Sequence, residues 1–217
     1  MKDKEKKHKL FYYFIKKFIA PLSLKIFIKK INNFENLNRE HPFIITSNHF
    51  SYLDPFLLSA IYTVYFNKKL YFIGKKKLFR TFIGKIFHEA SGTIPLDKSD
   101  KGRSALWKAQ KYLKEGKIIG IFPEGGLSKS KKLRKGKTGV ARLALATKVP
   151  VLIIGIKGTF ELMPIDRFIP KFKKTVIINV GELMYFNKYY NKKINRRILR
   201  KITNEIMSKI KSLMSTS

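Results

Sequence analysis

The hydrophobic positions of this chain form two kinds of pattern, short continuous runs and runs spaced three to four residues apart. The continuous runs are typical of strands buried on both faces, and the spaced runs are typical of amphipathic helices. The runs predict strands over residues 43–47, 70–73, 118–122, 150–156 and 172–180. The spaced positions predict helices over residues 56–64, 78–87, 104–113, 140–147 and 194–213. This alternation indicates an α/β fold with a central, largely parallel or mixed sheet flanked by helices.

The first 33 residues have a different pattern, in which aromatic and aliphatic clusters alternate with lysines. After a charged start, residues 10–31 are expected to be helical, and Pro21 is expected to divide them into a pair of amphipathic helices. The longest apolar run, residues 10–15, is far shorter than the roughly 20 residues that a helix needs to cross a bilayer. Basic, aromatic-rich helices of this kind lie in the membrane interface.

We therefore predict two regions. Residues 1–33 form a basic amphipathic membrane-interface segment, and residues 34–217 form a single α/β domain. The alternative for the first region is a pair of surface helices packed on the core, but its aromatic content exceeds what one core-facing stripe needs.

The net charge narrows the choice of partners. The chain has 47 Lys and Arg against 14 Asp and Glu, a formal net charge of +33 at pH 7 that is spread along its length. Such a charge favours an anionic membrane surface, an acidic protein or nucleic acid. We expect no nucleic acid, because no recognition-helix, zinc-knuckle or RNA-binding aromatic motif occurs. The absence of cysteine excludes disulfides, thiolate metal sites and a cysteine nucleophile.

His49 is the most promising chemical group because it lies at the end of a predicted strand. Five residues later, Asp54 and Pro55 open a predicted helix. Aspartate suits the N-cap position and proline the first helical position, so the turn would bring the carboxylate back toward the imidazole. The residues alone leave two interpretations open: a helix cap beside an ordinary loop histidine, or a catalytic pair.

A second loop with chemical potential begins at Pro123-Glu124-Gly125-Gly126, directly after the strand predicted over 118–122. The glycine pair is expected to expose backbone N–H groups that a phosphate can approach. Six cations follow it in the sequence: Lys129, Lys131, Lys132, Arg134, Lys135 and Lys137. A nucleotide P-loop is rejected, because its first glycine would fall at Lys131. The alternative for this loop is a solvated basic turn.

A third loop ends at Lys98, after a segment in which Pro95 predicts an edge strand or a strand entering a loop. Ligands of open α/β sheets bind where strands end. The loops around His49, Lys98 and Glu124 all follow predicted strands, so they can converge on one crevice.

Four short sequence blocks, which include these three loops, resemble in their content and order those of the glycerolipid acyltransferases typified by 1-acylglycerol-3-phosphate acyltransferase. Residues 48–54 resemble the family's Asn-His-x4-Asp block, and residues 122–128 its Phe-Pro-Glu-Gly-Thr-Arg-Ser block. Residues 92–98 resemble the block that ends in Asp-Arg, and residues 149–154 the Val-Pro-Ile-Val-Pro-Val block. The chain departs from the pattern at four positions. Gly126 replaces the usual threonine, Leu127 and Lys98 each replace an arginine, and Ile153 replaces a proline.

The resemblance implies an O-acyltransferase that moves a fatty acyl group from a thioester to the sn-2 hydroxyl of 1-acylglycerol-3-phosphate, forming phosphatidate. His49 would be the general base, a task that suits a side chain titrating near neutral pH, and Asp54 would orient it. The acceptor phosphate would lie near a set of five residues: Lys75, Lys98, Glu124, Gly125 and Gly126.

The resemblance also implies partners and a location. Lysophosphatidate would be the acceptor and acyl-CoA or acyl carrier protein the donor, with no separate cofactor and no metal. The protein would work as a peripheral or monotopic protein on anionic lipids at the cytoplasmic face of the cell membrane.

Two other functions stay open at this point. The first is an acyltransferase of the same fold with another lyso-lipid acceptor, because Leu127 removes a bidentate phosphate clamp. The second is a non-catalytic protein that binds polyanions or membranes. It is the weaker alternative, because charge alone does not explain four ordered blocks.

Overall fold

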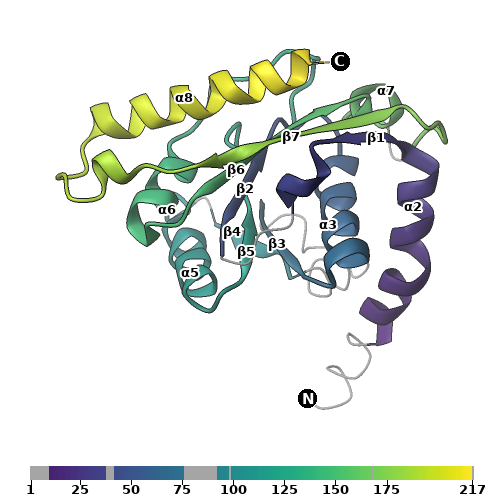
Figure 1. Ribbon diagram of the computed structural model, residues 1–217, viewed down its shortest axis with the longest axis horizontal. Helices are drawn as coiled ribbons and strands as arrows, with labels where there is room; N and C mark the ends of the chain where they lie inside the picture. The colour runs from purple at the N-terminus through teal and green to yellow at the C-terminus, as the bar shows by residue number, and fades with distance from the viewer. Residues whose placement is uncertain (1–9, 38–41, 76–91, 98, 168, 217) are drawn as a thin grey trace.

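The computed structural model describes residues 10–37, 42–75, 92–97, 99–167 and 169–216 (Figure 1). In this part of the chain, one seven-stranded sheet has the order β1-β7-β6-β2-β5-β3-β4. The strands are β1 (Ile28–Asn32), β2 (Ile44–Ser47), β3 (Leu70–Lys75), β4 (Ile94–Leu96), β5 (Ile118–Gly120), β6 (Val151–Lys157) and β7 (Val176–Met184). Neighbouring strands run parallel except β6 and β7, which are antiparallel. The predicted α/β class with a mixed sheet is confirmed.

Helices cover both faces of the sheet. They are α2 (Ala20–Phe27), α3 (Leu53–Phe66), α5 (Arg103–Lys114), α6 (Gly139–Thr147), α7 (Thr159–Leu162) and α8 (Arg196–Ser215), with short turns η1 (Ile15–Ile19), η2 (Phe34–Leu37) and η4 (Asn187–Tyr189). Helices α2 and α3 pack on one face, and α5, α6 and α8 pack on the other.

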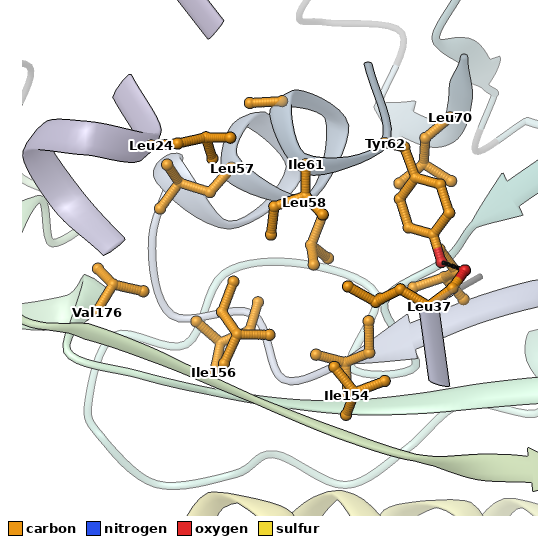
Figure 2. Close-up of a cluster of buried hydrophobic side chains, with 14 of the residues drawn as sticks. Leu24, Leu37, Leu57, Leu58, Ile61, Tyr62, Leu70, Ile154, Ile156 and Val176 are labelled. Carbon is orange, nitrogen blue, oxygen red and sulfur yellow. Dashed lines mark hydrogen bonds between the residues drawn. The ribbon is translucent and has the colours of Figure 1, made fainter. Parts of the chain in front are cut away.

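The central strands are apolar throughout because both of their faces are covered. Along β6, Leu152, Ile154 and Ile156 join the cluster under α2 and α3, whereas the alternate residues Val151 and Ile153 join the cluster under α6 and α8. Figure 2 shows the first cluster, in which α3 lies over β6. There the hydroxyl of Tyr62 donates to the carbonyl of Leu37 at 3.2 Å, which satisfies a buried polar group.

The N-terminal region differs from the predicted helix pair. Residues 10–27 are helical without a break, and residues 15–19 form a π-turn just before Pro21. A proline cannot donate to the preceding turn, and a wider π-turn accommodates that loss without ending the helix. The predicted helix is also wrong at its end, since Ile28–Asn32 forms β1 and pairs with β7.

Several other boundaries shift. The strand predicted over 172–180 lies at Val176–Met184, the strand predicted over 118–122 ends at Gly120, and Pro95 lies in the edge strand β4 as expected. The helix predicted over 78–87 lies outside the described residues. Within the described part of the chain, no helix is long and apolar enough to cross a membrane.

Candidate active site

The candidate site begins where β2 ends, at Asn48. This side chain is fully buried and is clamped to the end of the neighbouring strand β6: its amide nitrogen donates to the carbonyl of Ile156 at 2.9 Å, and its oxygen accepts the Ile156 N–H at 2.8 Å. Because both ends of the side-chain amide are used, the backbone leaving β2 has one fixed direction. His49 is the next residue, so this clamp also fixes the position of its backbone.

The predicted contact between His49 and Asp54 is present. Nδ1 of His49 lies 3.1 Å from Oδ2 of Asp54, and the same oxygen accepts the backbone N–H groups of Phe50 and Ser51 at 2.7 and 2.8 Å. With Nδ1–H directed at the carboxylate, the neutral imidazole presents Nε2 as a proton acceptor. The second oxygen of Asp54, Oδ1, is buried and has no hydrogen-bond partner among the described residues.

The way in which Asp54 reaches the histidine differs from our expectation. Helix α3 begins at Leu53, its N-cap residue is Tyr52, and Asp54 lies inside the first turn, so the predicted N-cap role of Asp54 and first-position role of Pro55 are wrong. The Leu53 N–H is satisfied instead by the hydroxyl of Ser51 at 3.0 Å. Asp54 closes the turn that precedes the helix, in a place where the helix dipole also favours a carboxylate.

Two stacked aromatic rings lie against one face of the imidazole. The His49 ring lies 3.9 Å from the ring of Phe122 with an interplanar angle of 11°, and Phe122 stacks on Phe72 at 5.2 Å. The His49 side chain is 14% exposed. The stack fixes the plane of the ring, while the contact with Asp54 fixes its rotation within that plane.

Glu124 ties the His49 turn to the glycine turn. Its side chain is buried, one oxygen accepts the N–H of His49 at 2.7 Å, and the other accepts the N–H of Arg134 at 2.8 Å. The Ser128 N–H also donates to the His49 carbonyl at 2.9 Å. Burial raises the pKa of the Glu124 carboxyl, and the two backbone N–H groups oppose that shift.

The glycine turn has room for one long cation. Gly125 has φ +69°, and a Cβ there would lie 2.8 to 2.9 Å from the end of the Lys137 side chain. The N–H of Gly125 donates to the carbonyl of Phe122 at 3.1 Å, so the predicted exposure of both glycine N–H groups is wrong for Gly125. The Lys137 side chain therefore brings positive charge to this turn.

A cavity of about 1360 Å³ opens beside His49. Apolar side chains from the N-terminal helix, α3, β3 and the glycine turn form most of its lining, among them Ile15, Phe56, Leu70, Phe122 and Leu127. Among the described residues, four cations also line it: Lys69, Lys101, Lys137 and Arg142. Burial, together with the nearby Lys117 cation, lowers the pKa of Lys69. An apolar cavity with a few polar groups is the usual form of a site for a small or lipidic molecule.

The structure brings together His49, Asp54 and the Glu124-Gly125-Gly126 turn, as predicted. Lys98 and the side chain of Lys75 lie outside the described residues. No pattern in the sequence indicated the ring stack or the clamp made by Asn48, because both depend on residues far apart in the chain. Lys137 was visible only as one of six cations in a basic loop. No three His, Asp or Glu side chains among the described residues lie close enough together to hold a metal ion.

The fold and the site together define a class: an α/β protein with a carboxylate-oriented histidine beside a lipid-sized apolar cavity. Comparison with known proteins agrees with this class, because residues 29–157 match the Acyltransferase family. The chain belongs to that family.

The individual relatives are named as lipid acyltransferases. The chain is 33% identical over 158 residues to the chloroplastic 1-acyl-sn-glycerol-3-phosphate acyltransferase LPAT1 of Arabidopsis thaliana, a match that covers 71% of this chain and 43% of the relative. It is 32% identical to the 1-acyl-sn-glycerol-3-phosphate acyltransferase of Bacillus subtilis, over 61% of this chain and 66% of the relative.

One solved structure has a similar fold. The 1-acyl-sn-glycerophosphate acyltransferase PlsC of Thermotoga maritima superposes with a TM-score of 0.71 and 25% identity, covering 100% of this chain and 85% of the other. The match to the two plant relatives, from Arabidopsis thaliana and Brassica napus, spans less than half of their length.

Proposed function

We propose that this protein transfers a fatty acyl group from an acyl thioester to the sn-2 hydroxyl of 1-acylglycerol-3-phosphate, forming phosphatidate. The observation that carries the proposal is the placement of His49: its Nδ1 faces Asp54, and its ring lines the large apolar cavity. The names of the relatives support lysophosphatidate as the acceptor.

The proposed reaction uses His49 first as a base and then as an acid. The acceptor hydroxyl gives its proton to Nε2 while its oxygen bonds to the thioester carbonyl carbon. The tetrahedral intermediate then collapses, the C–S bond breaks, and the imidazolium returns the proton to the leaving thiolate. Asp54 stabilises the imidazolium between these steps, since its Oδ2 already accepts from Nδ1.

The surroundings of His49 support the other parts of the proposal. The apolar lining of the cavity suits fatty chains, and the cations at its wall suit the phosphate of the acceptor. In this proposal Glu124 acts through the backbone of His49, since both of its oxygens already accept backbone N–H groups. The donor is acyl-CoA or acyl carrier protein, whose anionic groups match the net charge of +33.

The test of the mechanism is the variant His49→Ala. Loss of the general base is expected to lower kcat by about 10²- to 10⁴-fold with little change in the KM for either substrate. The assay follows thiol release from acyl-CoA and from acyl carrier protein, with and without lysophosphatidate. Ile194→Ala, an exposed site away from the cavity lining, serves as the control variant. Near-normal acyl transfer by His49→Ala would refute the assignment.

We also propose that the protein works bound to anionic lipid at the cytoplasmic face of the cell membrane. The N-terminal helix supports this, because six of its large apolar side chains are exposed: Leu10, Tyr13, Phe14, Phe18, Ile19 and Leu22. Lys17, which is also exposed, lies among them, where it can bind a lipid phosphate.

A further inference from the structure

The loop between α7 and β7 carries a surface that the proposed reaction does not use. We call residues 163–167 and 169–175 the rim loop. Its backbone is fixed, because the Lys171 N–H donates to the carbonyl of Leu162 at 2.9 Å and the Arg167 N–H donates to that of Pro164 at 3.0 Å. At its base, the hydroxyl of Ser51 donates to the carbonyl of Met163 at 2.7 Å. Because Ser51 belongs to the turn that joins His49 to Asp54, the rim loop is attached directly to the candidate active site.

The tip of the rim loop exposes two large apolar side chains. Ile169 is 73% exposed and Phe172 is 72% exposed, and among the other large hydrophobic side chains that the structure describes only Leu10, at 72%, is as exposed. Between and around them lie exposed cations, Arg167, Lys171, Lys173 and Lys174, with Asp166 as the one exposed acid of the loop. An apolar pair surrounded by cations is the combination that suits a boundary between lipid headgroups and acyl chains.

The rim loop contacts the N-terminal helix. The ring of Phe172 stacks on that of Phe27 in α2, with centroids 6.0 Å apart and an interplanar angle of 19°. Figure 1 shows the loop, in light green before β7, beside the C-terminal end of α2. The two elements thus present exposed apolar and basic side chains next to one another.

Both elements also line the cavity that holds His49. Met163, Ile165 and Pro170 come from the rim loop, whereas Tyr12 and Ile15 come from the N-terminal helix. A lipid entering the cavity between these two elements would therefore pass from the surface that they expose toward the histidine.

We propose that the rim loop is a second membrane contact, which inserts Ile169 and Phe172 at the headgroup boundary of an anionic bilayer while its cations bind lipid phosphates. This inference rests on the proposed function, because it assumes a substrate that resides in the bilayer. A second copy of the chain fits the surface less well, since each copy carries a net charge of +33 and would repel the other. An acidic protein would match the cations but gives no reason for the exposed apolar pair.

The direct test places a fluorescent probe on the loop. Trp107 is the sole tryptophan, so Trp107→Phe gives a silent background in which Ile169→Trp reports on the rim loop. In the same background, Phe18→Trp reports on the N-terminal helix and Ile194→Trp serves as the matched exposed control. Each full-length variant is mixed with phosphatidylglycerol–phosphatidylcholine vesicles that contain a spin-labelled lipid. Emission of the Ile169→Trp protein is expected to shift to the blue and to be quenched, and that of the Ile194→Trp protein is expected to stay unchanged.

Each outcome separates this inference from the proposed function. If the Phe18→Trp probe is quenched and the Ile169→Trp probe is not, the rim loop is not a membrane contact although the protein binds membranes. If neither is quenched and the protein does not sediment with vesicles, membrane association itself is wrong. If the Ile169→Trp emission shifts to the blue without vesicles as protein concentration rises, the loop contacts a second copy and the inference is overturned.

Activity provides an independent readout. The double variant Ile169→Gln/Phe172→Gln is expected to lower acyl transfer to lysophosphatidate embedded in vesicles about tenfold relative to transfer to detergent-dispersed lysophosphatidate, because less apolar surface enters the bilayer. Ile194→Gln is the control and is expected to leave this ratio unchanged. An equal loss in both assays would place the effect in the cavity and would overturn the inference.

Discussion

At the scale of single residues, the candidate site depends on carboxylates that accept backbone N–H groups. Asp54 closes the turn around His49, and Glu124 links that turn to the backbone of Arg134. Neither carboxylate makes an ion pair with a lysine or arginine in the described part of the chain, although the protein is strongly basic. The site is therefore held by directed hydrogen bonds, which depend on geometry more than on net charge.

Glu124 gives a prediction about pH. Its pKa is raised by burial, so the folded state binds the proton more tightly than the unfolded state, whose carboxyl has the ordinary pKa of 4.5. The resulting stabilisation is complete below that value and is lost as pH rises through the raised pKa. In Glu124→Gln this pH-dependent contribution is absent. The excess free energy of unfolding of the wild-type protein over the variant should therefore fall as pH rises from 4 through this window, as measured by urea unfolding.

The same variant should also be less stable at every pH. An amide has one acceptor oxygen, so either the His49 or the Arg134 N–H loses its partner, at a cost of about 1–3 kcal/mol. Glu182→Gln, at an exposed position of β7, is the control. A pH-independent difference between wild type and Glu124→Gln would contradict the raised pKa of Glu124.

At the scale of elements, the sheet positions the imidazole through aromatic rings. Gly120 ends β5, and a Cβ there would lie 2.3 Å from the ring of Phe72, which stacks on Phe122. Phe122 in turn stacks on His49. The ring stack therefore requires a glycine at position 120. Through the stack, this glycine also helps to set the plane of the His49 imidazole.

Gly120→Ala tests this relation. The methyl group must displace a buried ring, so we expect a loss of stability of about 1–3 kcal/mol together with a lower kcat. Thermal unfolding and initial rates measure the two effects. Gly139→Ala is the matched control for stability, because a Cβ there would lie an ordinary 3.4 Å from Ile121. A variant Gly120→Ala with normal stability and kcat would show that the ring stack does not fix His49.

At the scale of the whole molecule, the N-terminal region combines an exposed helix with a part of the sheet. The side chains of Ala20, Leu24 and Phe27 are in the core, and β1 pairs with β7. Deleting residues 1–33 would therefore remove a strand and core side chains along with the exposed apolar residues. Membrane binding has to be tested by substitution on the exposed part of the helix.

We expect Phe14→Gln/Phe18→Gln to weaken binding to anionic vesicles by about tenfold or more while the protein stays folded, since both rings are exposed. Binding by the wild-type protein should also weaken as the salt concentration rises, because salt screens the attraction between its positive charge and the anionic lipids. Vesicle sedimentation measures both effects, with Tyr185→Gln/Ile194→Gln as the control. Unchanged binding by the Phe14→Gln/Phe18→Gln variant would refute the proposed role of the helix.

The sequence by itself determined what depends on neighbours along the chain. Apolar periodicity fixed the class of the fold and the approximate place of most of its strands and helices, because burial on one or both faces imposes a local repeat. The spacing of His49 and Asp54 predicted their contact, since a five-residue turn keeps them together. Even so, the sequence misplaced the start of α3 by two residues, because the helix begins at Leu53, whose N–H donates to the hydroxyl of Ser51, and not at Pro55.

The tertiary structure decided everything that joins distant segments. The partners of Glu124, the stack of Phe72, Phe122 and His49, and the clamp from Asn48 to β6 all link residues that no local repeat relates. The same holds for β1. Its sequence predicted a helix, but it forms a strand because β7 supplies hydrogen-bond partners for its backbone. Local patterns record which face of an element is buried, whereas hydrogen bonds and ring contacts depend on which elements the fold places side by side.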